Sequence, residues 1–120
     1  MKSYKELIVW QKSFELTKEI YKITVNFPRE ELYGLVSQMR RATLSIPSNI
    51  AEGFSRSYTK EFVQFLKIAF GSGAELETQL LLAKELKFLR NEEYNSLDQT
   101  LQEIMKMLNK MISTLKNSSH

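Results

Sequence analysis

The sequence predicts an all-α protein, an antiparallel four-helix bundle in up-down-up-down order whose second helix is kinked at Pro47. Apolar residues recur along the chain at the three- and four-residue spacing of amphipathic helices. Only 4 glycines and 2 prolines interrupt this pattern, and the short connections favour antiparallel neighbours. We expect one domain, residues 1–120, with helices over residues 5–26, 29–53, 58–89 and 92–116.

The first helix, 5–26, ends before Pro28 and carries two apolar stripes on different faces. One stripe is Leu7, Trp10, Phe14, Tyr21 and Val25, and the other is Val9, Leu16, Ile20, Ile23 and Phe27. A helix on the outside of a small bundle needs only one apolar face. Either both stripes pack within one chain, or one of them faces another subunit.

The second helix, 29–53, has Pro47 within its apolar stripe. Proline lacks an N–H group and clashes with the carbonyl four residues earlier, here that of Thr43, at a cost of about 3 kcal/mol unless a kink relieves it. Ile46 and Ile50 continue the stripe in phase, so we expect a kinked but continuous helix. The hydroxyl groups of Thr43 and Ser45 are expected to bond the backbone that the kink frees.

The third helix, 58–89, has Ser57 as its expected N-cap and is apolar over a wide arc, which indicates contacts on more than one side. Gly71 and Gly73 lie in its middle, where a kink or a close approach of two helices would explain them. A phosphate-binding loop is the alternative, but no strand precedes it. The fourth helix, 92–116, follows Asn91 as N-cap and has one clean apolar stripe.

The composition excludes several classes of chemistry. There is no cysteine, and the single histidine is His120, so thiol catalysis, thiolate metal sites and histidine-based sites are absent. Glu75 and Glu77 point about 200° apart on a helix and cannot share a site. We therefore expect no enzyme, no metal and no cofactor. The chain also lacks an apolar run long enough for a membrane span or a secretory signal, so we expect it in the cytoplasm.

The polar face of the second helix is chemically specific. Arg41, Ser45 and Glu52 fall within about 60° of one another, and Asn49 flanks them. This row is either an ordinary solvated surface or, as we favour, a set of polar contacts to a neighbouring helix or subunit. Arginine binds carboxylates bidentately, so we expect Arg41 to pair with Glu52 or Glu75. The interface or structural candidates are Arg41, Ser45, Asn49, Glu52 and Glu75.

Nucleic acid is the other binding partner that the charge permits. The net charge is +3, and Arg40, Arg56 and Lys60 are candidates for phosphate contact around the turn between the second and third helices. Arg41 and Tyr58 would belong to the same patch. Repetition of the patch around a symmetric oligomer would multiply its charge and give salt-dependent phosphate binding.

Taken together, the residues resemble the four-helix-bundle proteins encoded in intervening sequences of bacterial 23S ribosomal RNA genes. The resemblance extends from about Leu7 to Leu115 and rests on several motifs. These are Val9-Trp10-Gln11 with Tyr21, Phe27-Pro28 with Glu31, Gln38-Met39-Arg40-Arg41-Ala42, Ser45-Ile46-Pro47-Ser48-Asn49-Ile50-Ala51-Glu52-Gly53, Phe62, Phe65-Leu66, Ala69, Gly71-Ser72 and Glu75-Leu76-Glu77. Gly73 departs from the family, which more often has a larger apolar residue there.

The resemblance implies a ring-shaped homo-oligomer, a pentamer, and similarity to the accessory protein of diversity-generating retroelements, a basic barrel that binds a reverse transcriptase and nucleic acid. We therefore expect a non-enzymatic scaffold that assembles with itself and binds RNA, another nucleic acid or a protein. An accessory subunit that binds a reverse transcriptase or another enzyme is the alternative.

Overall fold

Four α-helices make up most of the structure, a computed structural model that describes residues 3–118. They are α1 (Ile8–Thr24), α2 (Ser37–Phe54), α3 (Thr59–Glu85) and α4 (Asn91–Ser118). The described residues contain no β-strand. The prediction of an all-α protein with four helices is confirmed.

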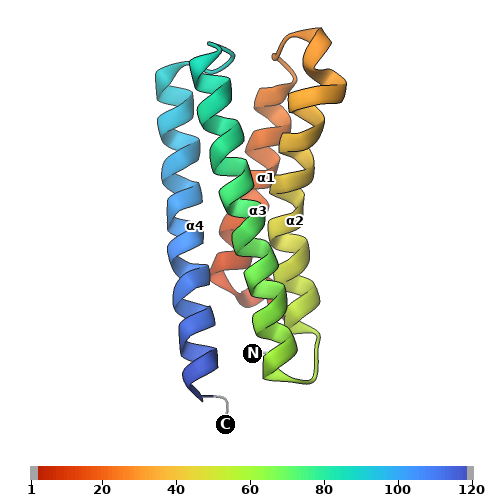
Figure 1. Ribbon diagram of the computed structural model, residues 1–120, viewed down its shortest axis with the longest axis vertical. Coiled ribbons are helices and arrows are strands. Elements are labelled where there is room, and N and C mark those ends of the chain that lie inside the picture. Colours follow the sequence, from red (N-terminus) through yellow and green to blue (C-terminus); the bar gives the residue numbers. More distant parts are fainter. Residues whose placement is uncertain (1–2, 119–120) are drawn as a thin grey trace.

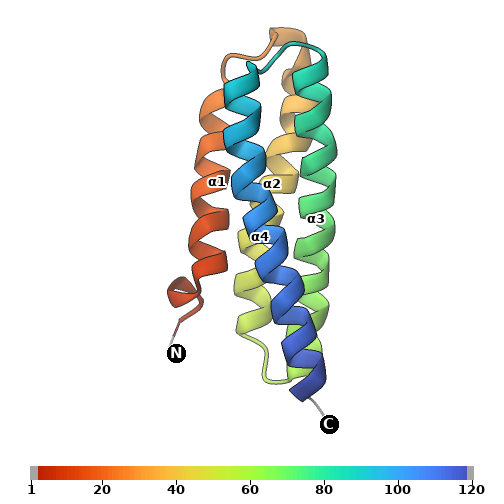
Figure 2. The same ribbon diagram turned by 90° about the vertical axis from the view of Figure 1, so that its left-hand side faces the viewer.

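The helices lie side by side along the long axis of a rod that measures 49 × 22 × 20 Å (Figure 1). The sequence colours in Figure 1 run up α1, down α2, up α3 and down α4. Each helix packs against the next one in the chain, and α1 also packs against α4. Consequently α1 and α3 occupy opposite corners of the bundle. Both described chain ends lie at one end of the rod, called here the terminal end (Figure 2).

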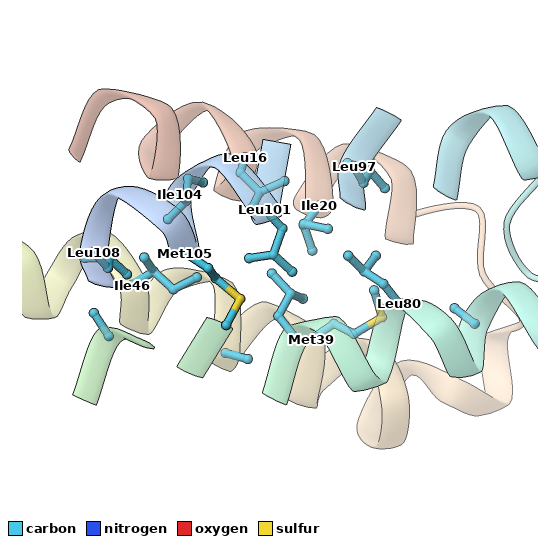
Figure 3. Close-up of a cluster of buried hydrophobic side chains, with 14 of the residues drawn as sticks. Leu16, Ile20, Met39, Ile46, Leu80, Leu97, Leu101, Ile104, Met105 and Leu108 are labelled. Carbon is cyan, nitrogen blue, oxygen red and sulfur yellow. The ribbon is translucent and has the colours of Figure 1, made fainter. Parts of the chain in front are cut away.

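The core lies along the axis of the bundle, and every helix contributes to it (Figure 3). The largest buried side chains are Leu16, Ile20, Met39, Ile46, Ile50, Leu66, Leu76, Leu80, Leu101, Ile104 and Leu108. Burying a side chain of this size stabilises the fold by about 1.5–3 kcal/mol. On α1, the core takes the stripe that contains Val9, Leu16 and Ile20. The other stripe is left mostly at the surface.

The helix expected over residues 29–53 is shorter than the sequence predicts. Arg29–Glu31 forms a 3-10 turn and Leu32–Val36 a π turn before α2 begins at Ser37. Gly34, at φ −111° and ψ −108°, lies outside the helical region and breaks the regular geometry. Its apolar neighbours keep the helical spacing across the break, which is why the periodicity alone did not reveal it.

The helix expected over 58–89 begins at Thr59 and ends at Glu85. Tyr58 takes the N-cap position in place of Ser57 and makes no side-chain cap bond. At the other end, Lys87 adopts φ 65°, its N–H donates to the Lys84 carbonyl at 2.9 Å, and the Phe88 N–H donates to the Ala83 carbonyl at 2.8 Å. This is the Schellman pattern that usually has glycine at the left-handed position. Because Lys87 stands where glycine is usual, the sequence did not predict that the helix ends here.

Helix α2 continues through Pro47, as the sequence predicts, and Pro47 is buried. A kink at Pro47 stays a prediction. The carbonyl that Pro47 leaves without an amide donor, that of Thr43, lies 3.0 Å from the Thr17 hydroxyl oxygen of α1. The expectation that Thr43 and Ser45 would bond the freed backbone is wrong, because the donor comes from the neighbouring helix.

Two glycines lie where helices approach closely. A Cβ at Gly53 would stand 2.7 Å from the Phe65 Cβ, and one at Gly73 would stand 3.1 Å from the Met105 Cγ. Gly73 is therefore a site of close approach between α3 and α4, where the Met105 side chain lies against the glycine. Gly71 has no neighbouring atom within 4 Å, so nothing within the described chain requires a glycine there.

Candidate interaction surfaces

Ser45 joins α2 to α3, and Asn49 bonds to Ser45 within α2. The Asn49 Nδ2 donates to the Ser45 carbonyl at 2.7 Å and to the Ser45 Oγ at 2.9 Å, and the Ser72 Oγ donates to the Ser45 Oγ at 2.8 Å. These two candidates therefore bond within the chain, one of them across to a neighbouring helix. The Asn49 amide nitrogen and the Ser45 hydroxyl oxygen are therefore already hydrogen-bonded within the subunit.

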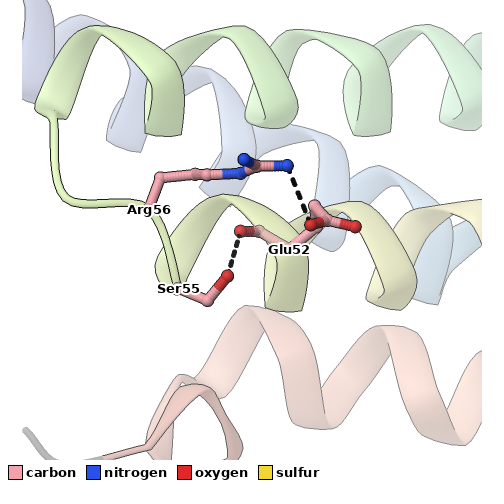
Figure 4. Close-up of polar contacts among 3 residues, drawn as sticks. All are labelled: Glu52, Ser55 and Arg56. Atoms are coloured by element: carbon pink, nitrogen blue, oxygen red, sulfur yellow. Dashed lines mark hydrogen bonds and ion pairs between the residues drawn. The ribbon is translucent and has the colours of Figure 1, made fainter.

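Glu52 pairs with Arg56 and not with Arg41 (Figure 4). The Arg56 Nη2 donates to the Glu52 Oε2 at 3.0 Å, and the Ser55 Oγ donates to the Glu52 carbonyl at 2.7 Å. The Arg56 guanidinium also lies 4.9 Å from the centre of the Phe65 ring. Arg56 is thus held by its own neighbours, which makes it a weaker candidate for phosphate contact than the sequence indicated.

Arg41 and Glu75 are both exposed, and neither has an ion-pair partner among residues 3–118. Within one chain Arg41 pairs with neither Glu52 nor Glu75, and a pairing between subunits stays a prediction. Arg41 lies four residues from Ser45 on α2, and Glu75 lies three residues from Ser72 on α3. Both are consequently near the α2–α3 seam and free to contact another molecule.

Arg40 fastens α2 to α1. Its Nε donates to the Thr24 Oγ1 at 3.0 Å, its Nη2 donates to the Tyr21 carbonyl at 3.3 Å, and its guanidinium carbon lies 4.9 Å from the centre of the Tyr21 ring. Along α2, Arg40 is about 21 Å from Phe54, the last residue of the helix, at a rise of 1.5 Å per residue, and Arg56 follows two residues later. The basic residues that the sequence grouped around one turn therefore lie toward different ends of the bundle.

Three lysines line one groove at the terminal end. Lys60 and Lys67 of α3 and Lys116 of α4 surround a volume of about 270 Å³. None of them has an ion-pair partner among the described residues. We call this site the lysine groove, whose lining is Thr59, Lys60, Val63, Gln64, Lys67 and Lys116. Lys60 was a sequence candidate, whereas Lys67 and Lys116 were missed because they are far apart in the chain.

Charge is divided between the two ends of the α3–α4 pair. Residues 59–74 and 104–118, at the terminal end, contain five lysines and one acid, a net charge of +4. Residues 75–103, toward the opposite end, contain three basic and seven acidic residues, a net charge of −4. Counting charge helix by helix conceals this division, because each helix spans both ends.

Two apolar faces remain at the surface on opposite corners. On α1, the Trp10 and Phe14 rings stack with their centres 4.9 Å apart, and Val25 is 72% exposed. We call the residues Trp10, Phe14, Tyr21 and Val25 the α1 face. On α3, Ile68, Leu82 and Leu86 are each about half exposed and recur at helical spacing around Glu75. We call these four residues the α3 face.

A second groove has a mostly apolar lining. An apolar groove of about 370 Å³ lies between α1, α3 and α4, and Lys110 is its only charged lining residue. Among residues 3–118, no three His, Cys, Asp or Glu side chains are grouped so that they could hold a metal ion. No helix in the described range is long and apolar enough to cross a membrane.

The chain matches the family model for the 23S rRNA-intervening sequence protein over residues 5–110, and it belongs to that family. It is also similar to a solved structure, a protein of unknown function from the S23 ribosomal protein family of Bacteroides thetaiotaomicron. The two are 30% identical, with a TM-score of 0.80 over 88% of this chain and 98% of the other. None of the curated proteins compared with the chain is similar enough to be a relative.

Proposed function

We propose that the protein is a non-enzymatic scaffold that assembles with copies of itself into a closed ring and binds nucleic acid. The observation that carries the assembly is the pair of unpartnered apolar faces on α1 and α3. Large apolar side chains exposed in rows are unusual on a monomer and mark surfaces that pack against another protein.

The placement of the two faces indicates how copies would meet. Because α1 and α3 are at opposite corners, the α1 face of one copy can pack on the α3 face of the next. Such a head-to-tail contact repeats from copy to copy, and it generates a ring when the rotation between neighbouring copies closes. Lys22, which has no ion-pair partner among the described residues, lies beside the α1 face, and Glu75 lies within the α3 face, so these two charges are complementary. A ring of five copies is the form that the family resemblance favours.

Size-exclusion chromatography with light scattering tests the assembly. We expect the wild-type chain to be an oligomer at about 10 µM, and Phe14→Glu and Leu82→Glu to be folded monomers, because each variant puts a charge into one face. Tyr33→Glu is the matched control, since Tyr33 is 92% exposed and lies outside both faces. A monomeric wild-type chain would contradict the proposal.

Mixing the two variants tests the head-to-tail geometry. Phe14→Glu keeps an intact α3 face, and Leu82→Glu keeps an intact α1 face. An equimolar mixture should therefore form a heterodimer that grows no further. If α1 faces met only α1 faces, Leu82→Glu would form a homodimer on its own and would not bind Phe14→Glu, and the proposed geometry would be wrong.

Binding of nucleic acid is supported by the positive charge at the terminal end, which a ring would bring together from every copy. Fluorescence anisotropy of a labelled RNA across a salt series tests it. We expect affinity to fall steeply with salt, as counterion release requires. Weak binding that does not change with salt would contradict this part of the proposal. Arg40→Ala is a poor probe, because Arg40 holds α1 and α2 together.

A further inference from the structure

We infer that the lysine groove binds the phosphates of single-stranded nucleic acid, with the Tyr58 ring as a platform for a neighbouring base. The inference rests on the proposed binding of nucleic acid and gives it a site. Three ammonium groups from two helices line the groove, together with the Thr59 hydroxyl and the Gln64 amide, both neutral hydrogen-bond donors.

The electrostatics of the groove favour an anion. Lys60, Lys67 and Lys116 have no carboxylate partner within the described chain, so their like charges repel one another until an anion neutralises them. Glu61 is the only acid in residues 59–74, and it points about 100° away from Lys60 around α3.

The start of α3 adds to this field. Thr59 is the first residue of a 27-residue helix, and its N-cap, Tyr58, provides no side-chain acceptor. The positive end of the helix dipole therefore lies beside the groove without a side-chain cap. It acts together with the three lysines and would not define a site without them.

Tyr58 distinguishes nucleic acid from other anions. Its side chain is 69% exposed, and it immediately precedes the first groove residue. Proteins that bind single strands without reading the sequence combine lysines or arginines along the backbone with aromatic rings on which bases stack. Lysine suits such a ligand because its charge requires no fixed bidentate geometry.

The test is anisotropy with a fluorescein-labelled single-stranded RNA of about 20 nucleotides and the full chain at about 50–300 mM KCl. The groove variant is Lys60→Gln/Lys67→Gln/Lys116→Gln. The matched control, Arg29→Gln/Lys84→Gln/Lys87→Gln, loses the same charge away from the groove and outside both apolar faces. Three lost phosphate contacts should reduce the slope of log affinity against log salt by about 2, at about 0.7 per contact. The control should leave the slope near that of the wild type.

Tyr58 is tested separately. Tyr58→Ala should weaken RNA binding at least about fivefold, whereas Tyr58→Phe, which keeps the ring, should bind as the wild type does. Thermal unfolding followed by circular dichroism should show that all variants are folded, since every substituted side chain in the groove set is at the surface.

Several results would overturn the inference. If both triple variants lose affinity equally, the binding is general attraction to positive charge; the lysine groove is then not the site, although nucleic-acid binding itself stands. If the wild type binds an oligoglutamate peptide through the groove but no RNA at about 50 mM KCl, the groove is a protein-binding site, and both proposals fail. If Tyr58→Ala binds RNA as tightly as the wild type, the base platform is wrong.

Discussion

Thr17 lies buried between α1 and α2, where its hydroxyl oxygen is 2.8 Å from the Ser13 carbonyl oxygen and 3.0 Å from the Thr43 carbonyl oxygen. The Ser13 carbonyl already has the amide of its own helix, whereas Pro47 removes the amide that would serve Thr43. A buried carbonyl needs a donor. The single hydroxyl proton therefore stabilises the fold most when it is donated to Thr43.

Thr17→Val should lower the free energy of unfolding by about 1–3 kcal/mol, because it leaves the Thr43 carbonyl buried without a donor. In a Pro47→Ala chain the restored amide can serve that carbonyl, so the same substitution should cost less than about 1 kcal/mol. Urea denaturation of the wild type, the two single variants and the double variant gives the coupling free energy between Thr17 and Pro47. Thr78→Val, on the exposed side of α3, is the control and should change stability by less than about 0.5 kcal/mol. Equal costs with and without Pro47 would refute this role for Thr17.

Glu93 accepts hydrogen bonds from Arg90 at the N-terminus of α4. Hydrogen bonds from the Arg90 side chain, at 3.1 Å, and from the Arg90 backbone N–H, at 2.8 Å, lower the pKa of the Glu93 carboxyl below its ordinary value. A lowered pKa in the folded state means that the ionised carboxylate stabilises folding. The contribution of Glu93 to the free energy of unfolding is complete above the pKa of glutamate in the unfolded chain, near 4.5. It is lost as the pH falls through the lower pKa that Glu93 has in the folded chain.

Glu93→Gln should therefore lower the thermal midpoint at pH 7 by about 2 °C, the size expected of one interaction at a helix end. The difference from the wild type should close at about pH 3. Glu19→Gln, at an exposed position of α1, should show no such pH dependence. A difference that persists unchanged at pH 3 would show that the charge of Glu93 is not responsible. Calorimetry at pH 7 and at about pH 3 measures the difference in thermal midpoint.

At the scale of the elements, the glycines of α2 and α3 differ in what surrounds them. Gly71→Ala should raise the free energy of unfolding by about 0.5–1 kcal/mol, because alanine favours the helix and the site is open. Gly53→Ala should lower it by about 1–3 kcal/mol, because the new Cβ would overlap the Phe65 Cβ at 2.7 Å. Gly73→Ala should change the free energy of unfolding by an amount between these two, because the flexible Met105 side chain can adjust to the new Cβ.

Denaturation of these variants in a Leu82→Glu background would separate the effects within the subunit from any contribution of assembly. If Gly71→Ala lowers the free energy of unfolding of the Leu82→Glu chain, helix propensity does not determine the effect of a substitution at position 71.

The ends of the elements show the limit of periodicity. The apolar spacing predicted the existence and order of all four helices, because core burial imposes that spacing directly. It missed the irregular turns before Ser37 and the end of α3 at Glu85. At both places the stripe continues across the break, and the backbone conformations of Gly34 and Lys87 decide the boundary.

At the scale of the whole molecule, α1 and α3 present apolar faces on opposite corners, and the α3–α4 pair is basic at one end and acidic at the other. An assembly that forms only from folded chains stabilises them by mass action. The thermal midpoint of the wild type should therefore rise by several degrees between about 1 and 100 µM. That of Phe14→Glu should stay constant. A wild-type midpoint independent of concentration, measured by differential scanning fluorimetry, would contradict self-assembly.

The sequence by itself determined the fold class, because helical spacing, the scarcity of glycine and proline and the lack of cysteine are properties of the chain that need no knowledge of contacts. It also identified Ser45 and Asn49 as chemically specific and Lys60 as a candidate for anion contact. Only the tertiary structure decided that Thr17 bonds the Thr43 carbonyl, that Arg40 is held by α1, and which stripe of α1 remains exposed. The lysine groove likewise joins residues that are more than 40 positions apart in the chain. Periodicity places a residue on a face of its own helix, but the neighbour of that face is fixed only when the helices pack.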